Sequence, residues 1–175
     1  NITKIEIFLT MNLFLNELFN LENKVVLLTG SGGHLVSEMA RSCGMAGMKV
    51  VCTDFKLETA QKTMNQILDN GGDAIAIEVD VTKKVDHENA LSITIDSYGK
   101  LDYLLNGAGS NAPTPFFDIS VDEWNNILAV QLTGTMLSCQ VFGKYMIEQK
   151  YGSIINISSA SSGPPLSKAF TYSVA

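Results

Sequence analysis

The residues that first point to chemistry form a glycine-rich turn in the stretch TGSGGHLVSEMA, which follows an apolar run and opens a helical pattern. Glycines at such a junction let the backbone turn sharply and approach a phosphate, which the free N–H groups at the start of the helix then bind. A nucleoside-triphosphate loop, G-x-x-x-x-G-K, does not fit, because Leu35 and Val36 occupy its Gly and Lys positions counted from Gly30. The dinucleotide form G-x-G-x-x-G fits Gly30 and Gly32 but meets Leu35 at its third glycine.

A carboxylate at the end of the next apolar run strengthens the dinucleotide interpretation. Asp54 closes that run, where an acidic side chain can accept hydrogen bonds from the adenosine ribose hydroxyls. The same negative charge repels a 2′-phosphate, so we expect NAD as the cofactor rather than NADP. The plainer alternative is that Asp54 only starts a turn.

Five apolar runs separated by longer helical patterns must position these residues. The runs cover residues 24–29, 49–54, 74–80, 101–106 and 153–158. Near-continuous apolar runs are typical of strands buried on both faces, which indicates a parallel sheet. The longest helical pattern, residues 121–149, opens with the capping box Ser120–Glu123. Right-handed crossovers then predict an α/β fold, a Rossmann-type doubly wound parallel sheet whose ligand crevice lies at the carboxyl ends of the strands.

The composition restricts the partners. A chain of 175 residues with 46% hydrophobic residues and a net charge of −6 describes one compact acidic domain, for which we expect neither nucleic acid nor a membrane as partner. Cys43, Cys52 and Cys139 lack C-x-x-C spacing and predict buried, reduced thiols in a cytoplasmic protein. The two histidines are His34 and His87, and because His87 falls on a helix expected to be exposed, no metal site is predicted.

Several blocks together resemble the short-chain dehydrogenase/reductase family. The family's first block, T-G-x-x-x-G-x-G, corresponds to TGSGGHLV; its Asp after the third strand, its N-N-A-G and its Ser after the fifth strand correspond to VDVT, NGAG and INISS. Its Y-x-x-x-K begins as YSVA, with Tyr172 thirteen positions after Ser159, which is the family's interval. The resemblance covers residues 20–175, an NAD-binding domain, and leaves residues 1–19 as an N-terminal extension.

The resemblance implies a cofactor site and a catalytic site. It places Gly30, Gly33, His34 and Leu35 at the pyrophosphate, Asp54 at the ribose, Asp80 and Val81 beside the adenine, and Asn106, Gly107 and Ala108 along the second half of the cofactor. It makes Tyr172 the general base or acid and Ser159 the donor to the reacting oxygen, while NAD accepts hydride from a secondary alcohol that becomes a ketone. Gln131 stands where the family has the Asn of its catalytic tetrad.

The chain departs from the family pattern at four positions. His34 and Val36 replace the later glycines of the first block, and Gly107 replaces the second Asn of N-N-A-G. A side chain at position 34 must point away from the pyrophosphate or donate a hydrogen bond to it, and Val36 requires a wider approach of helix to strand. Gln131 either supports a water relay on its longer arm or caps a kink in the helix over 121–149.

Within the family, LLNGAGSNAPTP and GSIINISSASSGPPLSKAFTYS resemble the sugar-acid branch, which acts on mannonate and fructuronate or on gluconate. GGHL resembles dehydrogenases of nonulosonic-acid and surface-sugar pathways. The resemblance therefore implies a small-molecule substrate, a sugar acid or sugar derivative. It also implies a homotetramer or homodimer in which the helix over 121–149 packs against its counterpart.

The family pattern continues past the last residue given. Its lysine falls at position 176 and its last strands lie beyond, so the chain is expected to be an incomplete stretch of a longer protein whose C-terminal strands are missing here. Two other classes stay open. A non-catalytic dinucleotide-binding or scaffolding paralogue accounts for the departures, whereas a methyltransferase with a similar sheet leaves the spacing of Ser159 and Tyr172 unexplained.

Overall fold

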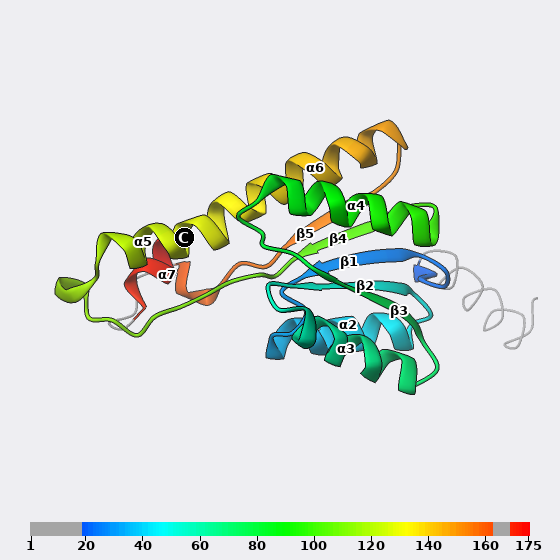
Figure 1. Ribbon diagram of the computed structural model, residues 1–175, viewed down its shortest axis with the longest axis horizontal. Helices are drawn as coiled ribbons and strands as arrows, with labels where there is room; N and C mark the ends of the chain where they lie inside the picture. The colour runs from blue at the N-terminus through cyan, green and yellow to red at the C-terminus, as the bar shows by residue number, and fades with distance from the viewer. Residues whose placement is uncertain (1–18, 163–168) are drawn as a thin grey trace, which may run out of the picture.

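The computed structural model describes residues 19–162 and 169–175, so nearly all of the predicted N-terminal extension lies outside the described residues. The strands are β1 (Val25–Thr29), β2 (Lys49–Asp54), β3 (Asp73–Glu78), β4 (Tyr103–Asn106) and β5 (Ser153–Asn156). The helices are α2 (His34–Met45), α3 (Leu57–Asp69), α4 (Lys84–Tyr98), α5 (Val121–Leu128), α6 (Gly134–Glu148) and α7 (Phe170–Val174). All five strands are parallel, in the order β3-β2-β1-β4-β5. Helices α2 and α3 cover one face of the sheet and α4 and α6 the other (Figure 1), which confirms the predicted doubly wound architecture.

The centre of the sheet is shielded from solvent, because β1 lies between β2 and β4 with helices on both faces. Every residue of β1 is buried, as the continuous apolar run predicts. The register aligns Thr29 with Asn106 and Asn106 with Asn156, so three neighbouring strands end at one level on polar residues. These strand ends supply the floor of the candidate site.

The start of α5 and the end of α3 have identifiable chemical causes. The N–H of Glu123 donates to Ser120 Oγ at 3.1 Å, which caps α5 as predicted. The carboxylate of Glu123 does not complete the capping box but accepts from Thr114 Oγ1 at 2.7 Å. Helix α3 ends before Gly71, whose φ of +81° supplies the left-handed residue that such an end requires.

The helix predicted over 121–149 is interrupted. A π-helical segment, η2 (Ala129–Thr133), joins α5 to α6 and contains Gln131. Directly after it, Gly134 packs so closely against Val81 that a Cβ at position 134 would lie 2.9 Å from Val81 Cγ2. The π segment therefore lies immediately before this close contact, and π segments of this kind are frequent at functional sites.

The prediction that His87 lies on an exposed helix face is wrong. Its ring is fully buried, with Nε2 2.9 Å from the carbonyl oxygen of Val81 and its plane edge-on to Phe142. Burial lowers the pKa of His87, because the charged imidazolium loses its hydration. Within the described ranges, no three His, Cys, Asp or Glu side chains are grouped so that they could hold a metal ion.

The cysteines follow the prediction only in part. Cys52 is buried, and burial raises the pKa of its thiol to about 12. Cys43 and Cys139 are half-buried, and all three are free thiols. None of the helices that the structure describes is long and apolar enough to cross a bilayer.

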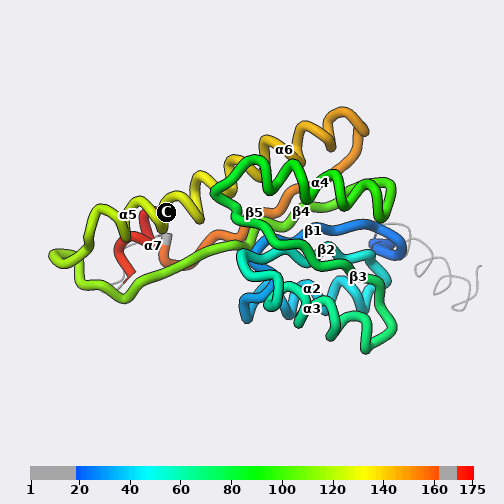
Figure 2. Tube along the Cα trace, viewed as in Figure 1, coloured from blue at the N-terminus to red at the C-terminus, as the bar shows by residue number. Residues whose placement is uncertain are grey.

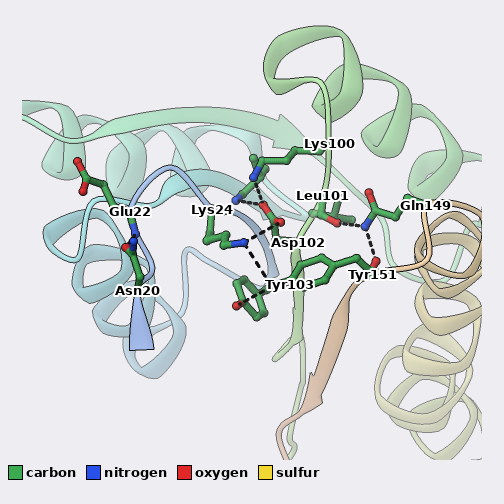
Figure 3. Close-up of polar contacts among 10 residues, drawn as sticks. Asn20, Glu22, Lys24, Lys100, Leu101, Asp102, Tyr103, Gln149 and Tyr151 are labelled. Carbon is green, nitrogen blue, oxygen red and sulfur yellow. Dashed lines mark hydrogen bonds and ion pairs between the residues drawn. The ribbon is translucent and has the colours of Figure 1, made fainter. Parts of the chain in front are cut away.

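The amino ends of the strands carry a separate polar network (Figure 3). Asp102 is only 3% exposed and accepts a hydrogen bond from the N–H of Val25 at 2.8 Å. Its carboxylate also pairs with Lys100 at 2.9 Å and with Lys24 at 3.8 Å, so the buried charge is compensated. This network joins the starts of β1 and β4 at the end of the sheet away from the candidate site.

Candidate active site

A cavity of about 580 Å³ opens at the carboxyl ends of β4 and β5. The strand ends form one side, and the π segment, the first turns of α6 and the end of α7 form the other. Figure 2 shows how the chain runs beyond the sheet to α5. Helix α7, which follows β5 in the sequence, lies beside α5. The cavity brings together Asn106, Gln131, Ser159 and Tyr172.

The floor of the cavity is a hydrogen-bonded pair of strand-end asparagines. Asn106 Nδ2 donates to Asn156 Oδ1 at 2.9 Å, and Ser138 Oγ donates to Asn106 Oδ1 at 2.6 Å. These bonds fix the orientation of the Asn106 amide. Ser138 and Asn156 were not predicted from the sequence, because the fifth apolar run extends to Ser158, whereas β5 ends at Asn156 as β4 ends at Asn106.

Gln131 reaches the cavity from the π segment. Its Oε1 is buried and has no hydrogen-bond partner among the described residues, so the amide oxygen does not cap the interrupted helix. A buried acceptor without a partner is costly, and a bound hydroxyl, amide or water would satisfy it. Of the two interpretations of Gln131, the structure therefore gives no support to the helix-capping one.

In the sequence, Ser159 precedes and Tyr172 follows residues 163–168, which lie outside the described part of the chain. Ser159 is half-buried, and its Oγ accepts a hydrogen bond from the N–H of Ser161 at 3.1 Å. Tyr172 is also half-buried and lies on α7. Its helix is held by aromatic contacts of Phe170, whose ring centre lies 4.7 Å from that of Phe116 and 6.3 Å from that of Trp124.

The glycine turn lies beside this cavity and touches its wall. Gly30 has a φ of +75°, and a Cβ there would lie 2.8 Å from Ala108 Cα, so only glycine fits. Thr29 Oγ1 accepts hydrogen bonds from the N–H groups of Gly107 and Ala108 at 3.1 and 3.3 Å, which ties the two strand ends together. The glycine turn and the segment after β4 are therefore one continuous surface.

The start of α2 is open to an anion. Gly33 is its N-cap residue, no side chain of the described chain caps it, and His34 and Leu35 at its first two positions are exposed. The first N–H groups of a helix lack partners within the helix and carry a partial positive charge. The turn therefore fits a pyrophosphate, with the side chain of His34 directed into solvent at its edge.

Asp54 braces the glycine turn. Its Oδ2 accepts from the N–H of Gly32 at 2.9 Å, and its Oδ1 accepts from Thr59 Oγ1 at 2.7 Å and from the N–H of Lys56 at 3.2 Å. A carboxylate has about four lone-pair sites, so one remains on Oδ2 for a further donor such as a ribose hydroxyl. The alternative that Asp54 only starts a turn describes part of its role.

Asp80 and Val81 lie after β3 and outside the cavity lining. Asp80 Oδ1 accepts from Thr82 Oγ1 at 2.7 Å, and Oδ2 pairs with Lys83 at 3.2 Å. Partial burial raises the pKa of Asp80, but the hydrogen bonds from Thr82 and the ammonium of Lys83 outweigh it and lower that pKa. Val81 is only 9% exposed, which leaves little of its side chain for an adenine ring.

The fold and site together define a dinucleotide-binding α/β protein with a serine and a tyrosine at one cavity. A family model described as short chain dehydrogenase matches residues 24–175, and the chain belongs to this family. The uncharacterized oxidoreductase UxuB of Bacillus subtilis (strain 168) is 33% identical over 171 residues, which cover 89% of this chain and 62% of that protein. The 5-keto-D-gluconate 5-reductase of Escherichia coli (strain K12) is 32% identical over 148 residues, with coverages of 85% and 58%.

Solved structures agree with this assignment. The crystal structure of an NAD+-bound xylitol dehydrogenase has a TM-score of 0.84 and 26% identity, and the match covers 88% of this chain and 60% of that one. A short chain dehydrogenase from Mycobacterium smegmatis also has a TM-score of 0.84, at 30% identity, with coverages of 89% and 66%. The family binds a nicotinamide cofactor, and this chain spans less than two thirds of the length of these relatives.

Proposed function

We propose that the protein is an NAD-dependent oxidoreductase that interconverts a secondary alcohol and a ketone on a sugar acid or related sugar derivative. One observation carries this proposal. Residues from four separate segments, Asn106, Gln131, Ser159 and Tyr172, line one cavity, and that cavity adjoins the glycine turn. Such convergence of polar groups on one cavity is expected of an active site and has no purpose in a packed core.

In this proposal the residues of the chain hold the substrate and move its proton. Ser159 donates a hydrogen bond to the reacting oxygen, and Tyr172 removes the hydroxyl proton in oxidation or returns it in reduction. The unpartnered oxygen of Gln131 accepts a hydrogen bond from a water molecule or from the substrate. The nicotinamide, when bound, supplies the hydride acceptor or donor.

Asp54 is the basis for NAD as the cofactor. Three of its lone-pair sites are used inside the protein, which holds the carboxylate in place beside the expected ribose. A 2′-phosphate at this position would meet a fixed negative charge, so binding of NADP is disfavoured. The similarity to an NAD+-bound dehydrogenase supports this choice.

The substrate class rests on similarity and on the cavity. One relative is a 5-keto-D-gluconate 5-reductase and one structural neighbour is a xylitol dehydrogenase, so two polyhydroxylated substrates occur among the proteins that this chain resembles. The cavity has acceptors and donors to match, because Asn156, Gln131, Ser158 and Ser159 all line it. A small molecule rich in hydroxyl groups is the substrate that such a lining favours.

Assembly and location complete the proposal. Val121 and Ile147 are exposed apolar side chains along the helical segment from 121 to 149 and outside the cavity lining, and they suit its pairing with the same segment of another copy in a homodimer or homotetramer. Three free thiols suit the reducing cytoplasm. A monomer in sedimentation velocity would contradict the assembly.

The full-length protein tests the function directly. We expect a panel of sugar acids with NAD to produce NADH, followed by absorbance, and Ser159→Ala to lower kcat by about a hundredfold because one preorganised donor is lost. Ser153→Ala is the matched control, since Ser153 begins β5 at the other end of the strand and outside the cavity. Binding of NAD without turnover of any sugar acid or sugar alcohol would favour the non-catalytic paralogue.

A further inference from the structure

Two of the departures from the family pattern are in contact. Val36 lies in the first turn of α2 and is only 4% exposed, while Gly107 directly follows β4. A Cβ on Gly107 would lie 2.5 Å from Val36 Cγ2, a distance that real Cβ atoms essentially never show. The side chain of Val36 therefore occupies the space into which a side chain at position 107 would project.

The requirement for glycine at position 107 is steric. Gly107 is not among the described residues with positive φ, so its backbone conformation would accept any residue. The hypothetical Cβ also lies 3.3 Å from Leu105 Cδ2 and 3.4 Å from the carbonyl oxygen of Thr29, but those distances need only small adjustments. Val36 is thus the group that excludes a side chain at position 107.

The contact cannot be relieved by rotation of Val36. A valine within a helix has one strongly preferred χ1 rotamer, because its two methyl groups meet the preceding turn. Val36 also belongs to the buried cluster that includes Val26, Leu28 and Leu105. A side chain at position 107 would therefore push the start of α2 away from the end of β4.

We propose that Val36 and Gly107 are a matched pair of positioning residues. Together they set the separation between the N–H groups at the start of α2 and the segment from Asn106 to Ala108. This inference rests on the proposed NAD site, in which those two parts hold the pyrophosphate and the second half of the cofactor. Val36 and Gly107 then compensate each other, so the pair leaves the cofactor site intact although each residue departs from the family pattern.

The test is a double-mutant cycle in the full-length protein. The variants are Gly107→Ala, Val36→Ala and both together, with Gly143→Ala as the control, since a Cβ there meets Ile154 Cδ1 at an ordinary 3.5 Å. The Kd for NAD is measured by quenching of the intrinsic tryptophan fluorescence, to which Trp124 contributes, and folding is followed by thermal unfolding. The kcat and KM for NAD are measured on the same samples.

We expect Gly107→Ala to raise the Kd and KM for NAD about tenfold while the folded protein keeps most of its kcat. Val36→Ala alone changes the Kd by about threefold or less, because it only leaves a small gap, and the double variant returns to within about threefold of the wild type. Gly143→Ala binds NAD as the wild type does. If Gly107→Ala does not fold, the double variant is expected to fold and bind NAD.

Two results overturn the pairing: Gly107→Ala that binds NAD as tightly as the wild type, and a double variant that binds as weakly as Gly107→Ala or fails to fold. Failure of the wild type to bind NAD is a different result. It overturns the proposed function, and the positioning role falls with it. Results that contradict the pairing therefore appear only in the variants, whereas a result that contradicts the proposed function appears already in the wild-type protein.

Discussion

The glycine turn after β1 and the cavity between β5 and α7 lie at the same end of the sheet but differ in how closely their atoms are packed. In the turn, a Cβ on Gly30 would lie 2.8 Å from Ala108 Cα, and one on Gly32 would lie 2.4 Å from Thr59 Cβ. At the cavity, a Cβ on Gly109 would lie 3.6 Å from Gln131 Oε1, which itself lacks a partner among the described residues.

This difference bears on which changes in sequence each region accepts. In the turn and the adjoining segment after β4, Gly30, Gly32 and Gly107 are each in close contact with a neighbour, so a side chain added there needs a matching change, as we propose for Val36 and Gly107. At the cavity, the amide oxygen of Gln131 is buried beside Gly109 without a partner among the described residues, so its position is not fixed by a second, matching residue. In the proposed function, the closely packed turn suits a preformed surface for the cofactor, and the cavity leaves polar atoms for the molecules that react there.

The largest expected effect comes from adding one methyl group to each region, by Gly30→Ala in the turn and by Gly109→Ala at the cavity. Gly30→Ala should lower the free energy of unfolding by about 3 kcal/mol, because it combines a positive φ with a backbone contact that cannot move aside. Gly109→Ala should change it by less than about 0.5 kcal/mol, since its Cβ would make only an ordinary contact. Urea denaturation of both variants measures the contrast, and equal losses would contradict it.

A change of charge at Asp54 should have the next largest effect. Asp54→Asn keeps the shape of the side chain but removes the charge, and if the amide nitrogen takes the place of Oδ2 it cannot accept from the N–H of Gly32. We expect the Kd for NAD to rise about tenfold, as for a lost hydrogen bond to a charged group, and the preference for NAD over NADP to shrink. Asp69→Asn, on the exposed end of α3, is the control in the same titration. Unchanged affinities for both cofactors would remove Asp54 from the ribose site.

The smallest expected effect concerns His87, which packs behind the site against Val81 and Phe142. Its pKa is lowered in the folded protein, so acid favours the unfolded chain, which binds the proton more readily. The stability that it contributes is complete above the ordinary histidine pKa of about 6.5 and is lost as the pH falls through the lowered value. Thermal unfolding between neutral and mildly acidic pH should show a weaker pH dependence in His87→Gln.

Strand periodicity predicted the sheet well because buried parallel strands need continuous apolar runs, and these set the positions of Asp54 and Asn106 in advance. The resemblance to the family implied that Ser159 and Tyr172 belong to one site, and both residues line the same cavity. The sequence could not reveal contacts between segments far apart in the chain. Those contacts include the bond from Ser138 to Asn106, the burial of His87 behind Val81, and the fit of Val36 to Gly107.

The sequence offered a kink at Gln131 only as one of two interpretations, since the residues there have ordinary helical patterning. In the structure the π segment lies at this place, directly before the close packing of Gly134 against Val81. Single departures from a family pattern are therefore poor evidence of lost function until the neighbours of each residue are known. Of the four departures in this chain, Val36 and Gly107 are in contact, His34 is exposed at the start of α2, and Gln131 lines the cavity.

The central claim is that the turn binds NAD and that the cavity performs the chemistry, and Tyr172→Phe in the full-length protein tests it most directly. The variant removes one hydroxyl group from the cavity and leaves the turn unchanged. Tyr145→Phe is the control, because Tyr145 packs against the core outside the cavity lining. We predict that Tyr172→Phe binds NAD with wild-type affinity and forms NADH at least about a hundredfold more slowly on the same sugar acid. An unaffected rate would contradict the account.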